Sequence, residues 1–294
     1  MIEIHDPKDP RIGVFLNQKD AWLKAAHNPH ADTNPDRISD EGFFIAEGVL
    51  VVEQLIRSKF PIHSVLVTTN RAKNIADVLT SVPEGVPVYG ASQAVIDEIV
   101  GFPMHRGLLA CGIRLPNPDP IELAQGCRAL VVLEDLSNHD NVGSMFRSVA
   151  ALGGDGVGIW MTQRCCDPLY RKALRVSMGH VLKVPFAMVD DLASSLDDLH
   201  RLGLTTIALT PRADSITIDE SLNRKVDKPA LLFGAEGPGL SDEVLKKADL
   251  RVRIEIAKDV DSLNIAAAGA VGIHRYIDPQ IRNPPQANPN NPGH

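Results

Sequence analysis

Residues 127–160 read CRALVVLEDLSNHDNVGSMFRSVAALGGDGVGIW, two short apolar runs separated by an amphipathic stretch. The apolar runs are rich in Val, Leu and Ile and are bounded by turn residues, which predicts strands at 127–135 and 155–160. Between them, residues 141–153 carry apolar side chains at helical spacing, which predicts a helix. A strand, a helix and a strand in succession are typical of a parallel α/β sheet.

The same alternation continues towards the C-terminus and predicts one larger α/β domain at 127–278. Expected strands and helices follow one another in the stretches LTTIALT (204–210), PALLFG (229–234), LSDEVLKKA (240–248), LRVRIEI (250–256) and SLNIAAAGAVGIHRY (262–276). Further helices are expected at 168–179 and 190–203. Alternating strands and helices favour a parallel sheet that is covered on both faces.

A smaller α/β domain is predicted upstream, at 1–114, with residues 1–40 as an irregular, polar lead-in. Its expected elements are a strand and helix at 41–58, strands at 63–69, 86–90 and 107–113, and helices at 70–82 and 91–100. Residues 115–126 contain three prolines and are interpreted as a linker. The tail at 279–294 is rich in Pro and Asn, which predicts disorder.

Composition excludes several classes of protein. No apolar run approaches the roughly 18 residues of a membrane helix, and MIEIHDPKDP does not resemble a signal peptide. None of the four cysteines forms a C-x-x-C pair, so we expect reduced thiols, a cytoplasmic location and no metal site. The net charge of -7 argues mildly against nucleic acid, but five basic residues and one acid lie between Arg164 and Lys183.

The helix at 141–153 carries one residue that its apolar stripe does not explain. Arg147 points nearly opposite the stripe, at about 100° per residue. Asn141 stands at the helix start, where a short polar side chain can cap free amides, and Gly143 permits close approach to the first turn. The stripe itself consists of Val142, Met145, Phe146, Val149 and Leu152. A capped surface helix with a solvated Arg and an active-site helix both fit this pattern.

Two further stretches combine glycines with polar residues. ALLFGAEGPGLSDEV (230–244) runs from an apolar strand into a turn with Gly234, Gly237 and Gly239, and its spacing is not that of a Rossmann loop. Glu236 in that turn disfavours a phosphate cradle and favours a cationic ligand or a structural salt bridge; an ordinary turn also fits.

In IEIAKDVDSLNIAAAGAVG (254–272), Ser262 can cap a helix of Ala and Gly. Its small residues indicate close packing, either in an ordinary core or at a site, and Asn264 in the first turn is hard to explain as core. Arg171 and Arg175 are like-charged i,i+4 neighbours, with Lys172 beside them. A polyanion such as RNA would relieve their repulsion, although a solvated face is the usual role of such a charge cluster.

Together and in this order, these stretches resemble the SpoU (TrmH) family of RNA ribose 2'-O-methyltransferases, in the SPOUT superfamily. The resemblance covers about residues 128–277. Its motifs are Asn141-x-Gly143-x-x-x-Arg147, then Phe233 to Ser241, then Ile254-x-Ile256 followed by Ser262-Leu263-Asn264, with Arg175-x-Ser177-x-Gly179 as a further segment. Phe44 to Gly48 and His105 to Gly107 resemble landmarks of a ribosomal-protein-like RNA-binding domain. Arg106 and Glu255 stand where Gln and Pro are usual.

The resemblance implies a parallel sheet with a C-terminal trefoil knot, an exception to the rule that chains are unknotted. It also implies S-adenosylmethionine as cofactor, rRNA or tRNA as substrate, and a homodimer without metal or membrane. The implied cofactor contacts are Leu209, Thr210, Gly234, Gly239, Ile254, Ile256 and Leu263. The implied catalytic set is Asn141, Arg147, Glu236, Ser262 and Asn264, with Glu236 holding Asn141 or Arg147. The implied RNA contacts are Arg171, Lys172 and Arg175.

The family assigns Arg147 the role of base. Because arginine is effectively always protonated in proteins, we expect it mainly to orient the ribose and the adjacent phosphate. One rival hypothesis is a catalytically silent RNA-binding protein of the same fold. Another is an unrelated nucleotide-dependent α/β enzyme, which predicts a Rossmann glycine loop that EDLSNHDNVG does not provide. The choice between rRNA and tRNA and the methylated nucleotide stay open.

Overall fold

The computed structural model describes residues 1–16, 19–24, 41–101, 104, 106–260 and 262–277. The chain divides into two compact units. The first comprises Met1–Pro116 and Asp167–Lys183, and the second comprises Asn117–Cys166 and Val184–His294. The predicted disordered tail at 279–294 lies outside the described residues.

The second unit is built on a seven-stranded sheet in the order β10-β12-β9-β11-β6-β7-β8, and every neighbouring pair is parallel. All five residues of β6 and of β11 are buried, as expected for central strands covered on both faces. The predicted α/β class with a parallel sheet is therefore confirmed. The strands are β6 (Ala129–Leu133), β7 (Val157–Thr162), β8 (Phe186–Val189), β9 (Thr205–Leu209), β10 (Ile216–Thr217), β11 (Pro229–Phe233) and β12 (Leu250–Arg253).

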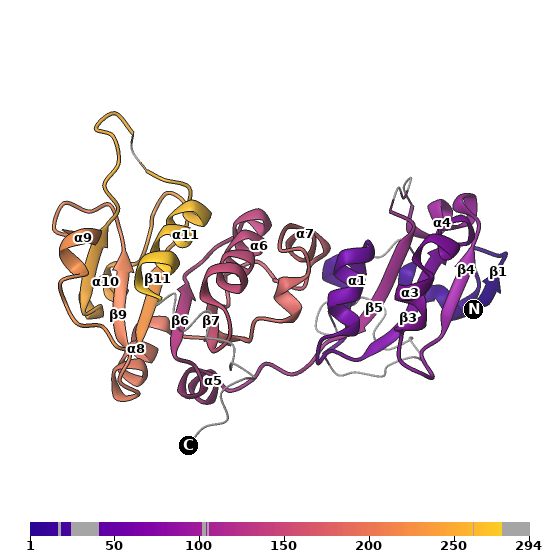
Figure 1. Cartoon of the computed structure of the whole chain (residues 1–294), viewed down its shortest axis with the longest axis horizontal. Coiled ribbons are helices and arrows are strands. Elements are labelled where there is room, and N and C mark those ends of the chain that lie inside the picture. Colours follow the sequence, from indigo (N-terminus) through magenta and orange to yellow (C-terminus); the bar gives the residue numbers. More distant parts are fainter. Residues whose placement is uncertain (17–18, 25–40, 102–103, 105, 261, 278–294) are drawn as a thin grey trace, which may run out of the picture. The chain divides into compact units, whose positions relative to one another are not determined.

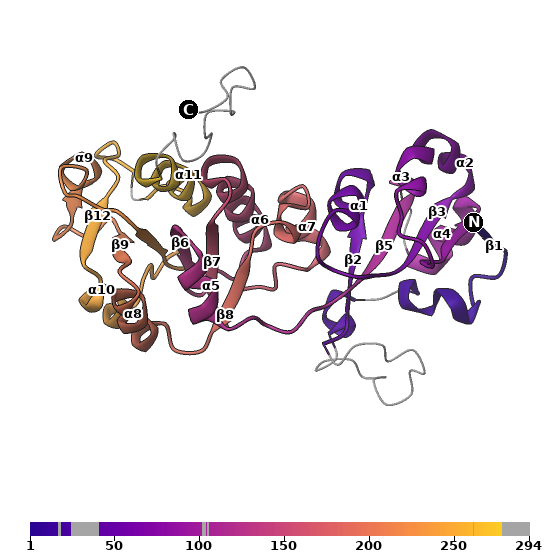
Figure 2. The same ribbon diagram turned by 60° about the horizontal axis from the view of Figure 1, so that its bottom comes forward.

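Helices cover both faces of this sheet, because successive strand residues point to opposite sides. Figures 1 and 2 show α6 (His139–Ser148) and α11 (Ile265–Tyr276) together on one face. On the other face, α5 (Pro120–Gly126), α8 (Leu192–Arg201) and α10 (Asp242–Lys247) enclose a core that contains Trp160. The sheet thus has a layer of helices on each side.

Four elements of the second unit differ from the sequence prediction. The proposed linker at 115–126 contains helix α5, because Asp119 accepts hydrogen bonds from the amides of Ile121 and Glu122 and Pro120 fits the first helical position. Strands β8 and β10 and the one-turn helix α9 (Ile218–Ser221) were not predicted. They are too short to show a periodic pattern.

The first unit contains a five-stranded mixed sheet in the order β1-β4-β3-β5-β2, in which β5 runs antiparallel to β2 and β3. The predicted helix at 70–82 is broken into α2 (Thr69–Ala72), a short 3-10 turn and α3 (Ala76–Thr80). The other elements are β1 (Ile2–Ile4), β2 (Phe43–Glu47), α1 (Val49–Ile56), β3 (Ile62–Thr68), β4 (Val88–Ala91), α4 (Gln93–Val100) and β5 (Leu108–Ile113).

The prediction of an irregular lead-in at 1–40 is wrong for its first part. Strand β1 pairs with β4, and two 3-10 turns follow at Pro10–Phe15 and Asp20–Leu23. Four apolar side chains of this segment are buried in the core of the first unit: Ile4, Ile12, Phe15 and Leu23. They are widely spaced among polar residues, so their burial could not be predicted from a periodic pattern in the sequence.

The segment Asp167–Lys183 packs with the first unit, although the sequence predicts it inside the domain at 127–278. It contains α7 (Arg171–Val176), which contacts β2, and a 3-10 turn (His180–Leu182), which contacts α1. The buried carboxylate of Asp167 lies 3.0 Å from Arg114 and 2.9 Å from Lys24. Burial alone would raise the pKa of Asp167, but these two cations outweigh it, so that the pKa lies below its usual value.

Candidate active site

Helix α6 begins two residues earlier than expected, at His139, and is capped by a different residue. The side chain of Asn138 accepts a hydrogen bond from the amide of Asp140, so Asn138 is the N-cap and Asn141 lies in the first turn. The prediction that Asn141 caps the helix is therefore wrong. Asn138 directly follows the turn after β6 and so reaches the free amides first.

The apolar stripe of α6 is confirmed for four of its five residues. Val142, Met145, Phe146 and Val149 are fully buried. Leu152 is only partly buried, because the helix widens into a π turn at Val149–Gly153 that rotates the following residues. Arg147 is exposed on the opposite side, and its side chain bonds to no other part of the chain that the structure describes. It is thus available to a ligand.

Asn141 joins two loops that are far apart in the sequence. Its Nδ2 donates a hydrogen bond to Glu236 Oε1 at 2.5 Å, and its Oδ1 accepts one from Asn264 Nδ2 at 3.2 Å. A carboxylate can only accept, so the amide of Asn141 must turn its nitrogen towards Glu236 and its oxygen towards Asn264. Because Asn141 is 5% exposed, both ends of its side chain need these partners.

Asn264 is also the N-cap of α11. Its Oδ1 accepts hydrogen bonds from the amides of Ala266 at 2.9 Å and Ala267 at 3.4 Å, while its Nδ2 is directed at Asn141. The prediction that Ser262 caps this helix is wrong, since α11 begins at Ile265 and Ser262 lies exposed two residues before the cap. We refer to the linked side chains of Glu236, Asn141 and Asn264 as the amide relay.

The loop from Gly234 to Leu240, here called the glycine loop, carries Glu236. Gly234 is required by packing, because a Cβ there would lie 2.1 Å from the backbone of Gly239 and of Leu240. The amide of Gly239 donates to the carbonyl of Ala235 at 3.0 Å, which closes the loop on itself. Gly237 has φ +90° in open space, a conformation that favours glycine without crowding it.

The three implied cofactor segments all leave one edge of the sheet. Strands β9, β11 and β12 are parallel neighbours, so their carboxyl ends lie together. Thr210 donates from its amide to Val252 at 2.9 Å and is buried. The residues assigned to the cofactor therefore start from a common edge: Leu209, Thr210, Gly234, Gly239, Ile254, Ile256 and Leu263. Figure 1 shows the segment between β12 and α11 projecting beyond the sheet.

Small residues in α11 allow this helix to pack closely. A Cβ on Gly269 would lie 2.2 Å from the sulfur of Met145 on α6, and one on Gly272 would lie 3.3 Å from the ring of Phe233 on β11. The expected close approach is present, although it is made by side chains of α6 and β11. It brings the start of α11, and hence Asn264, against α6.

The three basic residues assigned to RNA belong to α7 in the first unit. Arg171 Nε lies 2.8 Å from Asp20 Oδ1 and is about one quarter exposed, so its charge is already paired. Lys172 and Arg175 are exposed. The expected repulsion between Arg171 and Arg175 is thus reduced by Asp20, an acid 151 residues away that the sequence gave no reason to connect with them.

Glu134 and Asp135 follow β6 and were not selected from the sequence. Glu134 is buried and accepts a hydrogen bond from the amide of Ser241 at 2.8 Å. Asp135 has φ +60°, unusual for a residue with a side chain, and pairs with Thr162 and Arg164. The signal available in the sequence was two acids directly after a buried strand.

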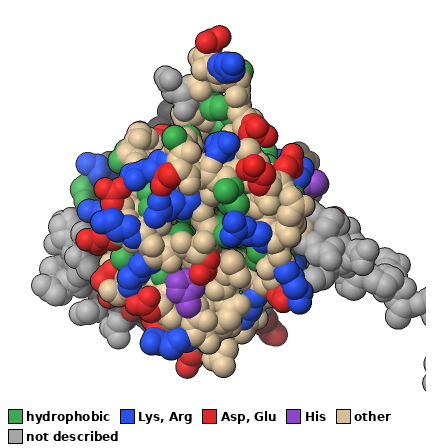
Figure 3. Space-filling model, turned by 90° about the vertical axis from the view of Figure 1, so that its left-hand side faces the viewer, with side chains coloured by type: hydrophobic (Ala, Val, Ile, Leu, Met, Phe, Trp, Pro, Cys, Tyr) green, Lys and Arg blue, Asp and Glu red, His purple; other side chains and the backbone are tan. Residues whose placement is uncertain are grey.

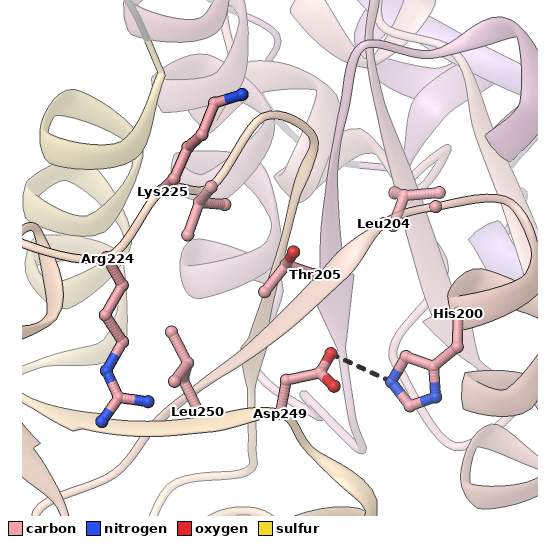
Figure 4. A pocket seen from close by; sticks show the side chains of 9 residues that line it. His200, Leu204, Thr205, Arg224, Lys225, Asp249 and Leu250 are labelled. Carbon is pink, nitrogen blue, oxygen red and sulfur yellow. Dashed lines mark ion pairs between the residues drawn. The ribbon is translucent and has the colours of Figure 1, made fainter.

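The described residues also form an open cavity of about 480 Å³ at the opposite, amino edge of the sheet. His200 Nε2 lies there 3.1 Å from Asp249 Oδ2. Figure 4 shows that the side chains of Arg224 and Lys225 point in different directions rather than towards one ligand position. The cavity is therefore separate from the amide relay and has no convergent set of charges.

Acidic and basic side chains are interspersed over the outer face of the second unit (Figure 3). The second unit also carries exposed ion pairs, such as Arg212 with Asp242 and Lys247 with Asp197. No group of three or more metal-binding side chains occurs among the residues that the structure describes. Within that same part of the chain, no helix has the length and apolar character needed to cross a membrane.

Burial raises the pKa of the Cys111 and Cys165 thiols, as expected for reduced structural cysteines.

The chain is similar to a family of RNA methylases and to bacterial proteins named as tRNA/rRNA methyltransferases. The model of the SpoU rRNA Methylase family matches residues 128–274. An uncharacterized tRNA/rRNA methyltransferase of Mycobacterium bovis is 38% identical over 92% of this chain and 90% of its own length, as is one of Mycobacterium tuberculosis.

Solved structures agree in fold. An AdoMet-bound rRNA methyltransferase from Sinorhizobium meliloti has a TM-score of 0.70 at 21% identity, covering 93% of this chain and 96% of that one. The SpoU methyltransferase AviRb from Streptomyces viridochromogenes has a TM-score of 0.72 at 19% identity, covering 93% and 98%. At these identities the similarity establishes the fold alone.

Proposed function

Because the chain belongs to the SpoU rRNA methylase family, we propose that it transfers a methyl group from S-adenosylmethionine to a ribose 2'-hydroxyl of rRNA or tRNA. The observation that carries this proposal is the amide relay, in which Glu236, Asn141 and Asn264 from three separate motifs are hydrogen-bonded to one another. Glu236 remains exposed although it is held through Asn141, which favours a role towards a ligand.

The cofactor lies at the carboxyl edge of β9, β11 and β12. Backbone groups of Gly234, Ile254 and Leu263 hold it, together with Leu209, Thr210, Gly239 and Ile256. We expect these segments to form the trefoil knot of the family. Support comes from the closed glycine loop, which presents backbone without side chains at Gly237 and Gly239.

In the transfer, the ribose 2'-oxygen would bond to the methyl carbon as the sulfur–carbon bond of S-adenosylmethionine breaks. S-adenosylhomocysteine would leave, and the proton of the 2'-hydroxyl would pass to the adjacent phosphate or to water. The protein's main contribution is to align the hydroxyl with the methyl group. Arg147 orients the phosphate next to the ribose, consistent with its exposed guanidinium, for which no partner is found among the described residues. The amide relay and Ser262 shape the pocket around the nucleotide.

RNA reaches the enzyme through basic residues of the first unit, chiefly Lys172 and Arg175, with the ribosomal-protein-like domain selecting the substrate. We assign a homodimer as the active form and the cytoplasm as its location. The dimer is supported by exposed apolar side chains on the β12–α11 segment and on α11, namely Ile256, Val260, Leu263 and Val271. An exposed apolar patch on a folded protein can mark a protein interface.

The experiment incubates purified protein with methyl-labelled S-adenosylmethionine and total RNA from a strain lacking this gene. The RNA is then digested and the labelled nucleotides are mapped. Label in one 2'-O-methyl nucleotide supports the proposal and identifies the substrate. Label in a base would refute ribose methylation. If the protein binds the cofactor but transfers no labelled methyl to free RNA or to ribosomal particles, the silent RNA-binding alternative is favoured.

A further inference from the structure

Glu134 connects both ends of the glycine loop to strand β6. Its amide donates to the carbonyl of Phe233, the residue before the loop, at 2.8 Å. Its carboxylate Oε2 accepts from the amide of Ser241, the residue after the loop, also at 2.8 Å. One residue therefore fixes the entry and the exit of the segment that carries Glu236.

The contact at the exit is strong because of where it lies. Glu134 is 8% exposed, and a buried carboxylate must be compensated by hydrogen-bond donors. Hydrogen bonds to a charged acceptor are shorter and stronger than neutral ones. Leu240, just before Ser241, is 4% exposed and anchors the same end of the loop in the core. The exit of the loop is thus held by one charged hydrogen bond and one buried side chain.

We propose that Glu134 is a positioning residue for methyl transfer. By holding the amide of Ser241, it keeps the glycine loop closed, the backbone around Gly234 shaped for S-adenosylmethionine, and Glu236 within reach of Asn141. Its carboxylate is occupied by Ser241 and takes no part in the chemical step. This inference rests on the proposed function of the glycine loop as part of the cofactor site.

The test removes either partner of the hydrogen bond and measures cofactor affinity by calorimetry. Glu134→Ala is expected to weaken S-adenosylmethionine binding roughly tenfold, whereas Glu134→Gln, which retains an acceptor, stays within about threefold of wild type. Ser241→Pro removes the donor, and φ at Ser241 is -62°, a value that proline adopts. Its matched control is Ser241→Ala, which retains the backbone amide and loses only the side-chain cap.

The losses of cofactor affinity caused by Glu134→Ala and by Ser241→Pro should not add. If the affinity loss arises from this hydrogen bond, then Glu134→Ala causes no further loss in a Ser241→Pro background. Additive losses would overturn the inference, because they would assign the two residues independent effects. Ser241→Pro and Glu134→Gln keep the test decisive even where Glu134→Ala does not fold.

Asp249 provides a control for general destabilisation. It accepts a hydrogen bond from the amide of Thr206 at 2.8 Å, at the opposite edge of the same sheet. Asp249→Ala is expected to lower the melting temperature and leave cofactor affinity unchanged. If Glu134→Ala behaves in the same way, its role is merely structural and the inference is overturned.

Hydrogen exchange tests the role of Glu134 separately from the proposed cofactor site. In wild type, S-adenosylmethionine should slow exchange of the amides from 234 to 241, and Glu134→Ala should weaken this protection. Wild-type binding without protection of this segment would overturn the proposed cofactor site and the inference with it. Protection in wild type, combined with unchanged affinity in Glu134→Ala and Ser241→Pro, would overturn the inference alone.

Discussion

Asn141 Nδ2 donates a hydrogen bond to Glu236 Oε1 at 2.5 Å, although the two residues are 95 positions apart in the sequence. The contact joins the first turn of α6 to the glycine loop, and it fixes which end of the Asn141 amide faces Asn264. Exchanging the donor and the acceptor of this hydrogen bond tests the orientation of the Asn141 amide.

Asn141→Asp places two carboxylates against each other, so we expect a loss of kcat of roughly 10- to 100-fold. Adding Glu236→Gln makes position 236 the donor and position 141 the acceptor. The double variant should therefore recover part of the lost kcat. The measurement is methyl-transfer kinetics of both single variants and the double variant. A double variant as slow as the product of the two single effects would contradict the relay.

The glycine loop gives a second prediction within one short segment. Gly234→Ala should abolish S-adenosylmethionine binding and lower the melting temperature, because its Cβ would meet backbone atoms 2.1 Å away that cannot move aside. Gly237→Ala introduces only backbone strain of about 1 kcal/mol, since the space around it is open. Calorimetry and thermal unfolding of both variants check this ranking. Equal effects of the two would argue that the loop is not closed as described.

The ion cluster of Asp167 with Arg114 and Lys24 predicts how stability depends on pH. Because the folded-state pKa of Asp167 is lowered, the cluster stabilises the fold above the ordinary aspartate pKa of about 3.9. This contribution is lost as the pH falls through the lower folded-state value. Asp167→Asn should lower the free energy of unfolding by about 3 kcal/mol at neutral pH, and the difference from wild type should shrink in acid.

Denaturant unfolding across pH measures this difference. Asp197→Asn is the matched control, because Asp197 forms an exposed pair with Lys247 and should change stability little. A deficit of Asp167→Asn that grows in acid would contradict the assignment.

The basic residues of α7 are expected to differ from one another. Arg175→Ala should leave stability unchanged, weaken RNA binding and reduce the salt dependence of the affinity by about one ion. Arg171→Ala should mainly lower stability, because Arg171 is already paired with Asp20. Affinity titrations at several salt concentrations, with thermal unfolding alongside, distinguish the two. The assignment fails if Arg171→Ala changes the salt slope and Arg175→Ala does not.

Strongly periodic segments were predictable from the sequence, and single contacts over long distances were not. The buried runs at β6 and β11 and the stripe of Val142, Met145 and Phe146 give their elements directly, since burial on one or both faces leaves a regular pattern. Strand β8 has four residues, too few to show a period.

Residues whose contacts join distant parts of the sequence show no such pattern. The motifs placed Asn141, Glu236 and Asn264 in one site, yet their hydrogen-bond partners and the true caps, Asn138 and Asn264, follow only from the three-dimensional structure. The attachment of α7 to the first unit depends on Asp20 and Asp167 meeting cations that are distant in the sequence. Domain membership of such a segment cannot be inferred from alternating strands and helices.

The most direct test of the central claim compares two exposed arginines of the second unit. Arg147 lies on α6, the helix that also carries Asn141, and Arg224 lines the cavity at the opposite edge of the sheet. Transfer of labelled methyl from S-adenosylmethionine to RNA is measured for Arg147→Ala and Arg224→Ala, with cofactor affinity measured in parallel. The account predicts that Arg147→Ala loses at least roughly 100-fold in kcat with cofactor affinity retained, while Arg224→Ala matches wild type. Near-full methylation by Arg147→Ala would contradict it.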